Sequence, residues 1–115
     1  MAKLPINENT KVETPDGKGC YYRQRIAEGV ENLGPKVKTY AKITVPAGTA
    51  MAYHKHEGDF EIYYIVEGEG LYNDNGTEYP VKVGDVVRCA DGECHGISNT
   101  GSGDLAFIAL IVATD

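Results

Sequence analysis

The sequence contains no tryptophan and only two methionines, and it has too few basic residues to balance its acidic ones. Eleven lysines and arginines stand against seventeen aspartates and glutamates, which gives a formal net charge of −6 at pH 7. Proteins that bind nucleic acid or an anionic membrane surface usually carry a basic patch. The chain also has no apolar run long enough to cross a bilayer. We therefore expect neither nucleic acid nor a membrane as a partner.

Cysteine is scarce, and its three positions, Cys20, Cys89 and Cys94, show no framework spacing. An odd number argues against a secreted domain held together by disulfides. A Cys89–Cys94 bridge is one interpretation of the nearer pair, and free thiols in a reducing compartment are the other. The N-terminal residues MAKLPINENTKVET contain no apolar segment of the kind found in signal peptides, so we expect a cytoplasmic protein.

Long segments with helical periodicity are missing as well, whereas glycine and tyrosine are abundant, with fourteen and eight residues. Short β-branched and aromatic runs alternate with breaker residues, which predicts an all-β sandwich or barrel. The length of 115 residues fits one domain, with an irregular N-terminal arm over residues 1–18 and a loop over residues 27–36. The expected strands span residues 11–14, 19–26, 37–45, 50–54, 61–67, 70–73, 78–83, 85–89, 96–99 and 105–113.

Two of these strands are apolar on both faces. Side chains alternate along a strand, so an inward Glu61 turns Tyr64 outward among other apolar residues of 61–67. Residues 105–112, LAFIALIV, likewise have no polar face. A strand of this kind is covered on both sides. We expect a second copy of the chain to provide the outer cover, which predicts a homodimer; the alternative is that the N-terminal arm folds over this face.

The three histidines of the chain form the clearest candidate site. His54 and His56 are separated by one residue, so a strand would place both imidazoles on one face. With Glu61 and the more distant His95 they would supply three nitrogens and one carboxylate. This donor set suits a divalent transition metal ion such as Mn, Fe, Ni, Cu, Zn or Co. The alternative is that the histidines are ordinary hydrogen-bonded side chains, because short motifs also occur by chance.

The spacing around the first two histidines extends the pattern. Gly48 is followed after five residues by His54-x-His56, after four more by Glu61, and after six more by Gly68. This arrangement resembles the first motif of the cupin superfamily. The resemblance implies a double-stranded β-helix, or jelly-roll barrel, in which these two histidines and Glu61 bind a metal ion.

A second stretch resembles the second motif of the same superfamily. Gly84 is followed after five residues by Ala90-x-Gly92, then after two residues by His95, and after three more by Asn99. Ala90 stands where the family usually has proline, which removes some turn rigidity but no ligand. The resemblance implies that His95 is the fourth metal ligand. We expect Gly92 to turn the chain so that His95 enters the barrel, and Asn99 to satisfy backbone groups of a loop.

The resemblance to single-domain cupins, including oxalate-decarboxylase-like ones, implies a metal-dependent enzyme that acts on a small oxygen-rich organic acid or diketone. Decarboxylase or dioxygenase chemistry with Mn or Fe would fit it, although established oxalate decarboxylases have two cupin units. A cupin-type sugar or sugar-phosphate isomerase is a second hypothesis. A third is a non-catalytic module that binds or senses a small carboxylate, which the missing catalytic acid favours.

Several residues are candidates for the substrate pocket. Arg23 and Arg25 alternate on one strand face and could hold a substrate carboxylate, or they could belong to a solvated surface. Tyr53, Tyr63 and Tyr72 could offer hydroxyl groups to the pocket, or they could serve packing.

Acidic and thiol groups lie close to the expected ligands in the sequence. Glu57 and Asp59 fall between ligands, on an expected loop at the pocket mouth. Either could be a general base if burial raised its pKa, or a solvated loop charge. Cys94 directly precedes His95 and could lie near the metal, or it could be a half-buried structural residue.

Overall fold

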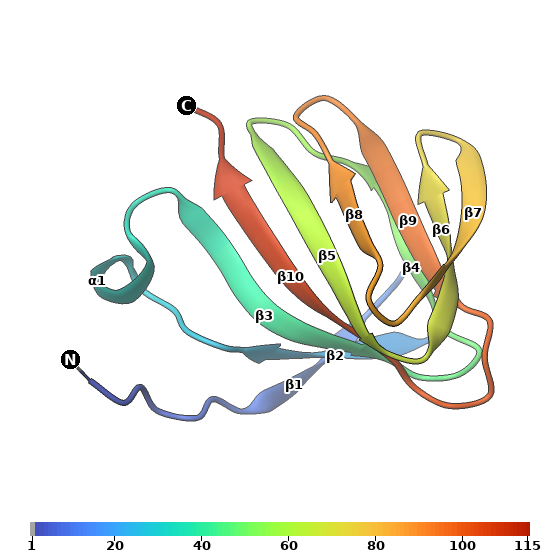
Figure 1. The fold of residues 1–115 in the computed structure, drawn as a ribbon, viewed down its shortest axis with the longest axis horizontal. Helices are drawn as coiled ribbons and strands as arrows, with labels where there is room; N and C mark the ends of the chain where they lie inside the picture. Colours follow the sequence, from blue (N-terminus) through green and yellow to red (C-terminus); the bar gives the residue numbers. More distant parts are fainter. Residues whose placement is uncertain (1) are drawn as a thin grey trace.

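The computed structural model describes residues 2–115, whose strands form two antiparallel β-sheets packed face to face (Figure 1). The larger sheet contains β1 (Asn9–Glu13), β2 (Cys20–Arg25), β3 (Val37–Val45), β5 (Asp59–Glu67), β8 (Val86–Cys89) and β10 (Leu105–Ala113). The smaller sheet contains β4 (Ala50–Lys55), β6 (Glu69–Asp74), β7 (Thr77–Lys82) and β9 (Cys94–Asn99).

The strand order is β1-β2-β3-β10-β5-β8 in the larger sheet and β4-β9-β6-β7 in the smaller one. From β3 onward the chain passes back and forth between the two sheets, which is the path of a jelly-roll barrel. The predicted all-β double-stranded β-helix is therefore confirmed. Along residues 2–115, no helix is long and apolar enough to cross a membrane.

The core lies between the sheets and follows from the alternation of the strands. In β5, Tyr63 and Ile65 are buried while Tyr64 between them is exposed. Phe107 of β10 is fully buried and stacks on the Tyr63 ring at a centroid distance of 4.1 Å. Burying a side chain of this size contributes roughly 1.5–3 kcal/mol. The core comprises Ala41, Ile43, Val45, Tyr63, Ile65, Tyr72, Val81, Val87, Ile97, Leu105, Phe107 and Ala109.

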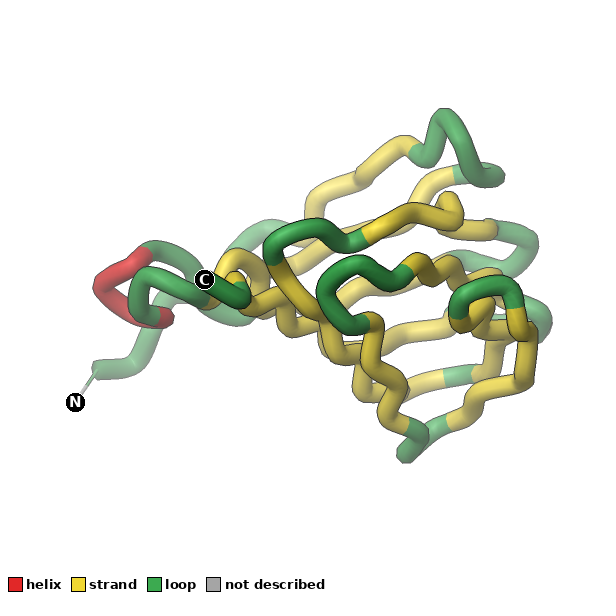
Figure 2. Tube along the Cα trace, turned by 90° about the horizontal axis from the view of Figure 1, so that it is seen from above, coloured by secondary structure: helices red, strands yellow, loops and turns green. Residues whose placement is uncertain are grey.

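The N-terminal arm is more regular than the sequence indicated. Strand β1 pairs with β2 and forms one edge of the larger sheet, so the predicted edge strand exists but starts two residues earlier. The predicted loop over residues 27–36 contains a single helical turn, α1 (Val30–Leu33), between Gly29 and Gly34, which both have positive φ. Figure 2 shows this part of the chain projecting beyond the two-layer barrel.

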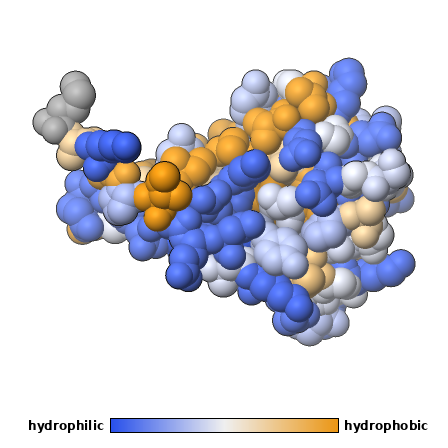
Figure 3. Space-filling view, turned by 90° about the horizontal axis from the view of Figure 1, so that it is seen from below, coloured by the Kyte–Doolittle hydropathy of each residue, from blue (hydrophilic) through white to orange (hydrophobic). Residues whose placement is uncertain are grey.

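The outer face of the larger sheet is apolar along β5 and β10, as the sequence predicted. Tyr64, Val66 and Val86 are exposed by 49%, 36% and 62%, and the strand register sets Tyr64 directly between Val86 and Ile108. Figure 3 shows a band of hydrophobic side chains along one face of the molecule. The arm does not fold over this face, because β1 lies beside β2 at the sheet edge.

The residues at two turn positions have clear physical causes in the structure. Gly68 has φ +76°, and a side chain there would collide with the carbonyl oxygen of Asp104. Asn99 donates from its amide to the carbonyl oxygens of Val45 and Gly103, both at 2.8 Å, and accepts from the backbone N–H of Gly101 at 2.8 Å. The expectation that Asn99 satisfies loop backbone groups is confirmed.

Candidate metal centre

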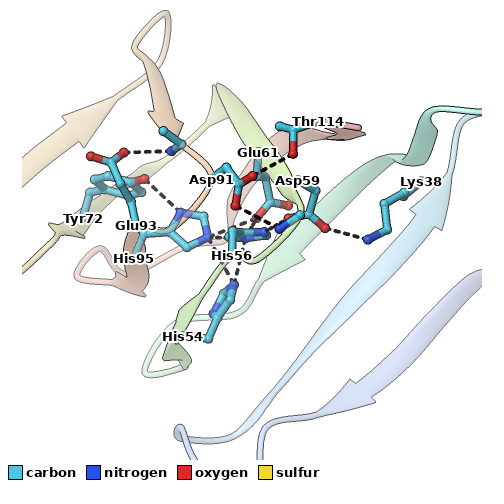
Figure 4. A network of polar contacts seen from close by, with 12 residues as sticks. Lys38, His54, His56, Asp59, Glu61, Tyr72, Asp91, Glu93, His95 and Thr114 are labelled. Carbon is cyan, nitrogen blue, oxygen red and sulfur yellow. Dashed lines mark hydrogen bonds and ion pairs between the residues drawn. The ribbon is translucent and has the colours of Figure 1, made fainter.

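Four side chains from three strands and one loop converge at one end of the barrel (Figure 4). His54 comes from β4, His56 follows that strand directly, Glu61 lies in β5 and His95 in β9. One ligand atom from each lies within 4.8 Å of all the others. His56, Glu61 and His95 are buried, whereas His54 is exposed. The structure thus brings together the four residues that the sequence predicted as ligands.

Strand register and loop contacts hold these residues in place. Strand β4 pairs with β9 so that His54 lies directly opposite His95. The backbone N–H of His56 donates to the carbonyl of Glu93 at 2.9 Å, and the N–H of Gly92 donates back to the carbonyl of His56 at 2.7 Å. Gly92 has φ +88°, a conformation that glycine adopts readily. The turn at Gly92 therefore delivers the chain to His95 as the sequence predicted.

The Nε2 atoms of the three histidines form a small triangle. They are separated by 3.2 Å (His54–His56), 3.1 Å (His56–His95) and 3.2 Å (His54–His95). The remaining candidate ligand, Glu61, places Oε1 at 3.0 Å from the Nε2 atoms of both His56 and His95. At these distances two such atoms either form a hydrogen bond with each other or coordinate the same metal ion.

The other ring nitrogens decide between these two options. Nδ1 of His54 lies 2.8 Å from the carbonyl oxygen of Ala52, and Nδ1 of His56 lies 2.7 Å from Oδ1 of Asp59. Both partners only accept hydrogen bonds, so each neutral ring carries its hydrogen on Nδ1.

The ring of His95 can also carry its hydrogen on Nδ1. Nδ1 of His95 lies 2.9 Å from the hydroxyl of Tyr72, which can accept from it. With all three hydrogens on Nδ1, three Nε2 lone pairs and a carboxylate oxygen face one another. This arrangement is unfavourable unless a cation lies between them, so the residues present fit a divalent metal ion.

Burial keeps His95 in the protonation state that metal binding requires. Burial lowers the pKa of His95, and the neighbouring histidines lower it further, although Glu61 opposes them. His95 is therefore held neutral, which is the form that binds a metal. Burial also raises the pKa of Tyr63 well above its ordinary value, and the nearby Glu61 carboxylate adds to this shift.

The three tyrosines that the sequence singled out have different places. Tyr63 is buried and stacks on the His95 ring at a centroid distance of 5.0 Å. Tyr72 is 1% exposed and contacts the same ring through its hydroxyl. Tyr53 is 50% exposed and borders a separate surface cleft with Leu71. Tyr63 and Tyr72 therefore support a ligand from behind, and Tyr53 lies away from the cluster's interior.

The two arginines border a cleft that none of the four candidate ligands lines. Arg23 and Arg25 pair with Ile43 and Ala41, so they are on the inner face of the larger sheet. They border a cleft of about 240 Å³, where Arg25 forms an ion pair of 3.3 Å with Glu28. Their proposed role as a clamp for a substrate carboxylate would require a ligand that extends from this cleft.

A different cleft, of about 210 Å³, opens beside His54. Its walls come from the N-terminal arm, β2 and β4. The sequence did not predict this contribution of the arm, because no pattern in residues 13–16 is typical of a site. The lining residues are Glu13, Thr14, Pro15, Asp16, Tyr21, Met51, Ala52 and His54.

The acidic residues between the ligands differ sharply. Glu57 is exposed and forms a surface ion pair with Lys55 at 3.3 Å. Asp59 was expected on a solvated loop, and that expectation is wrong: it begins β5 and is buried. Its carboxylate contacts Nζ of Lys38 and Nδ1 of His56, each at 2.7 Å. Burial favours a raised pKa for Asp59, but these two hydrogen bonds outweigh it and the pKa lies below its ordinary value.

Lys38 is a contact of the site that the sequence reasoning missed, since no local pattern connects it with residue 59. Cys94 lies opposite Lys55 in the β4–β9 ladder, one residue from His95, and is half-buried. Cys20, Cys89 and Cys94 are all free, so the structure contains no Cys89–Cys94 bridge.

Comparison with known proteins agrees with this fold. Residues 41–111 match the family model described as the cupin domain, which covers more than half of the chain. The protein therefore belongs to the cupin family, as the sequence motifs indicated.

Individual relatives narrow the comparison. A Thermotoga maritima protein named oxalate-binding protein is 48% identical over 82 residues, which are 71% of this chain and 68% of the relative. A Thermotoga maritima crystal structure, described as a predicted oxalate decarboxylase, has a TM-score of 0.88 at 39% identity and covers 93% of each chain. KdgF from a Halomonas species shares the fold alone, with a TM-score of 0.75 at 20% identity over 94% of this chain and 89% of that one.

Proposed function

We propose that this protein binds one divalent transition metal ion through His54, His56, Glu61 and His95, and through it a small dicarboxylate such as oxalate. The observation that carries the proposal is the convergence of three Nε2 lone pairs and one carboxylate oxygen, all within 4.8 Å of one another and with five of the six separations at 3.0–3.2 Å. When bound, the ion would supply positive charge and Lewis acidity at a partly open coordination sphere.

We propose Mn or Fe as the ion, with Zn, Ni, Cu or Co as alternatives. Two ligands at right angles on bonds of about 2.1 Å lie about 3.0 Å apart, whereas tetrahedral ligands lie about 3.4 Å apart. The five separations of 3.0–3.2 Å among the ligand atoms are nearer to the right-angled value. Four protein ligands would leave two positions open on a six-coordinate ion, and a bidentate acid could fill them.

Charge favours an anionic ligand at these positions. Three neutral imidazoles and the Glu61 carboxylate would leave the site with one net positive charge. A carboxylate is therefore preferred over a neutral molecule, and oxalate offers two oxygens with the required spacing. The oxalate-binding relative supports this ligand class for the present chain. The cleft beside His54 is the route by which such a ligand would reach the site.

Binding without turnover is the form of the proposal that the acid groups support best. Asp59 has both carboxylate oxygens in hydrogen bonds, and Glu57 points to solvent in an ion pair. Neither is placed as a general base or acid. The second candidate is a metal-dependent decarboxylase or dioxygenase, which the structural relative described as a predicted oxalate decarboxylase favours. An isomerase of sugar phosphates needs cations beside the metal, and Arg23 and Arg25 border another cleft.

The experiment is elemental analysis of untagged protein, followed by calorimetric titration with oxalate, malonate and acetate. We expect one metal ion per chain and metal-dependent binding of oxalate. Acetate should bind more weakly, because its single carboxylate fills only one of the two open coordination positions well. The His54→Ala variant is the control without a complete site. Release of carbon dioxide or consumption of oxygen would establish the enzyme instead, and a chain that takes up no metal would refute both forms.

We further propose a homodimer that buries the outer face of the larger sheet. Tyr64, Ile108 and Val86 form a continuous row there, and Ile62 lies opposite Leu110 in the next row. Apolar surface of this extent usually marks an interface. Sedimentation should give a dimer at micromolar concentration, and Tyr64→Lys should shift it toward monomer. A compact wild-type monomer would contradict this assembly.

We also propose that residues 1–115 act as one domain in the cytoplasm. The three free thiols support a reducing compartment. Fractionation of cells that express the protein with its native N-terminus would test the location.

A further inference from the structure

Three side chains form a line from the protein surface to the ligand cluster (Figure 4). Lys38 donates from Nζ to Oδ2 of Asp59 at 2.7 Å, and the other oxygen of Asp59 contacts Nδ1 of His56 at 2.7 Å. The side chains of Lys38, Asp59 and His56 are 52%, 10% and 8% exposed. The line therefore runs from a half-exposed ammonium to a buried imidazole, and each carboxylate oxygen has one partner.

An irregularity in the larger sheet aims Lys38 at this carboxylate. Ile111 pairs with Thr39 and Val112 pairs with Val37, so Lys38 is left without an opposite residue in β10. A bulge of this kind redirects the side chain of the extra residue. Here it brings a lysine of β3 across β10 to the first residue of β5.

The backbone beside Asp59 is fixed by other contacts. Gly58 donates its N–H to Oδ1 of Asp91 at 2.9 Å, and its carbonyl accepts from the N–H of Thr114 at 3.0 Å. The hydroxyl of Thr114 donates to the second oxygen of Asp91 at 2.7 Å. The position of Asp59 along the chain is thus independent of Lys38, which leaves the lysine to orient only its carboxylate.

His56 differs from the other two histidines in the partner of its Nδ1. His54 contacts a backbone carbonyl and His95 contacts a tyrosine hydroxyl, both of which are neutral. His56 alone contacts a carboxylate. A carboxylate partner fixes the tautomer and the orientation of a metal-binding imidazole.

We propose that Lys38 and Asp59 are a positioning pair, in which Lys38 orients the Asp59 carboxylate and Asp59 holds His56 with its hydrogen on Nδ1. The Nε2 lone pair of His56 is then directed into the ligand cluster. This inference rests on the proposed metal site, but its tautomer claim applies to the metal-free protein as well.

The substitution Asp59→Asn changes the hydrogen-bonding pattern of this side chain while it keeps nearly the same size and shape. A carboxamide has one acceptor oxygen and one donor nitrogen, whereas Lys38 and the Nδ1–H of His56 are both donors. The charged ammonium competes for the oxygen, so the amide nitrogen faces His56. The ring must then move its hydrogen to Nε2, where it blocks metal binding. Adding Lys38→Met removes the competing donor and lets the amide oxygen turn back to His56.

The first measurement is the tautomer of His56 in the metal-free protein, read from ¹⁵N NMR shifts of the ring nitrogens. We expect hydrogen on Nδ1 in the wild type, on Nε2 in Asp59→Asn, and again on Nδ1 in the Lys38→Met/Asp59→Asn double variant. A general loss of stability does not move these signals in this order.

The second measurement is the affinity for Co(II), followed by its visible absorption. We expect Asp59→Asn to weaken binding about 10–100-fold. The double variant should bind Co(II) at least about three times as tightly as Asp59→Asn does, because the two positions are coupled. The matched controls are Lys55→Met and Glu57→Gln, which break the neighbouring ion pair, and the Lys55 side chain is also 52% exposed. Both controls should stay within about twofold of the wild type.

Two results would overturn the positioning pair: wild-type tautomer and affinity in Asp59→Asn, or a double variant that binds more weakly than Asp59→Asn. Thermal unfolding identifies a variant that fails to fold, and the double variant then supplies the NMR comparison. A wild type that binds no metal would refute the proposed function alone. The tautomer order across the three proteins would in that case still support or refute the pair.

Discussion

His54 and His95 lie directly opposite each other in the β4–β9 ladder, and their Nε2 atoms are 3.2 Å apart. The register of this ladder shifts between Met51 and His54, so β4 is irregular immediately before the ligand. A metal ion bound by both histidines would join the two strands next to this irregularity. Metal binding should therefore stabilise the pairing of β4 with β9 around His54 and His95 in particular.

The first prediction concerns metal removal. Chelation of the bound ion should lower the midpoint of thermal unfolding, because an ion that binds only the native state adds about 2.7 kcal/mol at 100 times its dissociation constant. Circular dichroism with and without chelator measures the change. His56→Ala should unfold at the same temperature under both conditions. A variant that retained the full response to metal would show that His56 is no ligand.

The second prediction concerns the hydroxyl of Tyr72. Tyr72→Phe removes the hydroxyl that lies 2.9 Å from Nδ1 of His95. Tyr72 is only 1% exposed, so water cannot easily replace this hydroxyl. Leaving this nitrogen without a hydrogen bond should cost about 1–3 kcal/mol in the free energy of unfolding and should weaken metal binding. Urea unfolding and metal titration measure the two effects.

Tyr79→Phe is the matched control for this change. Tyr79 lies directly opposite Tyr72, and its hydroxyl donates to Asp74 at 2.9 Å, with no contact to a histidine ligand among residues 2–115. Burial and the Asp74 carboxylate raise the pKa of Tyr79 to about 12, so its hydroxyl stays neutral. We expect unchanged metal affinity. Equal losses of affinity in both variants would show that the effect does not depend on the contact between Tyr72 and His95.

The third prediction separates two glycines with positive φ. Gly68→Ala would place a methyl group against the carbonyl of Asp104, whereas at Gly84 no atom of residues 2–115 outside the glycine and its two chain neighbours lies within 4 Å of the added carbon. Gly84→Ala should cost only backbone strain, about 1–2 kcal/mol. Gly68→Ala should cost at least about 1 kcal/mol more, since backbone must also move. Equal stabilities in denaturant would contradict the collision.

The ligand set could be predicted from the sequence because it depends on local features. Alternation along a strand puts Glu61 and Tyr63 on one face, and a glycine turn brings His95 into the barrel. The all-β class likewise follows from short strands separated by turn residues, and the resemblance to the cupin motifs implied the jelly-roll barrel. These features act over a few residues, and the sequence displays them directly.

The positions of Asp59 and Lys38 could not be predicted in this way. Asp59 follows a glycine and resembles a loop residue, but it pairs with Ala113 at the far end of the chain. Lys38 reaches it only because β3 and β10 slip by one residue at this point. Arg23 and Arg25 do alternate as predicted, yet the cleft they border is set by the arm and the segment after β2. Such pairings depend on tertiary register, which no short stretch of sequence specifies.

The last prediction is the pH dependence of stability in the metal-free protein. Burial lowers the pKa of His95 in the folded state, whereas a histidine of the unfolded chain titrates near about 6.5. Below that pH the unfolded chain binds a proton that the folded protein does not. The free energy of unfolding should therefore fall as the pH falls from about 6.5 toward the pKa of folded His95, by at most about 1.4 kcal/mol per pH unit for this group.

Urea unfolding at pH 7.5, 6.5 and 5.5 measures this slope, and His95→Gln should make it shallower because the variant has no imidazole at this position. Asp59 does not interfere, since its lowered pKa places its contribution below about pH 4. A slope that His95→Gln leaves unchanged would show that another group takes up the proton. A stability that rises on acidification would mean that folded His95 binds a proton more readily than the unfolded chain, so that the Glu61 carboxylate outweighs burial.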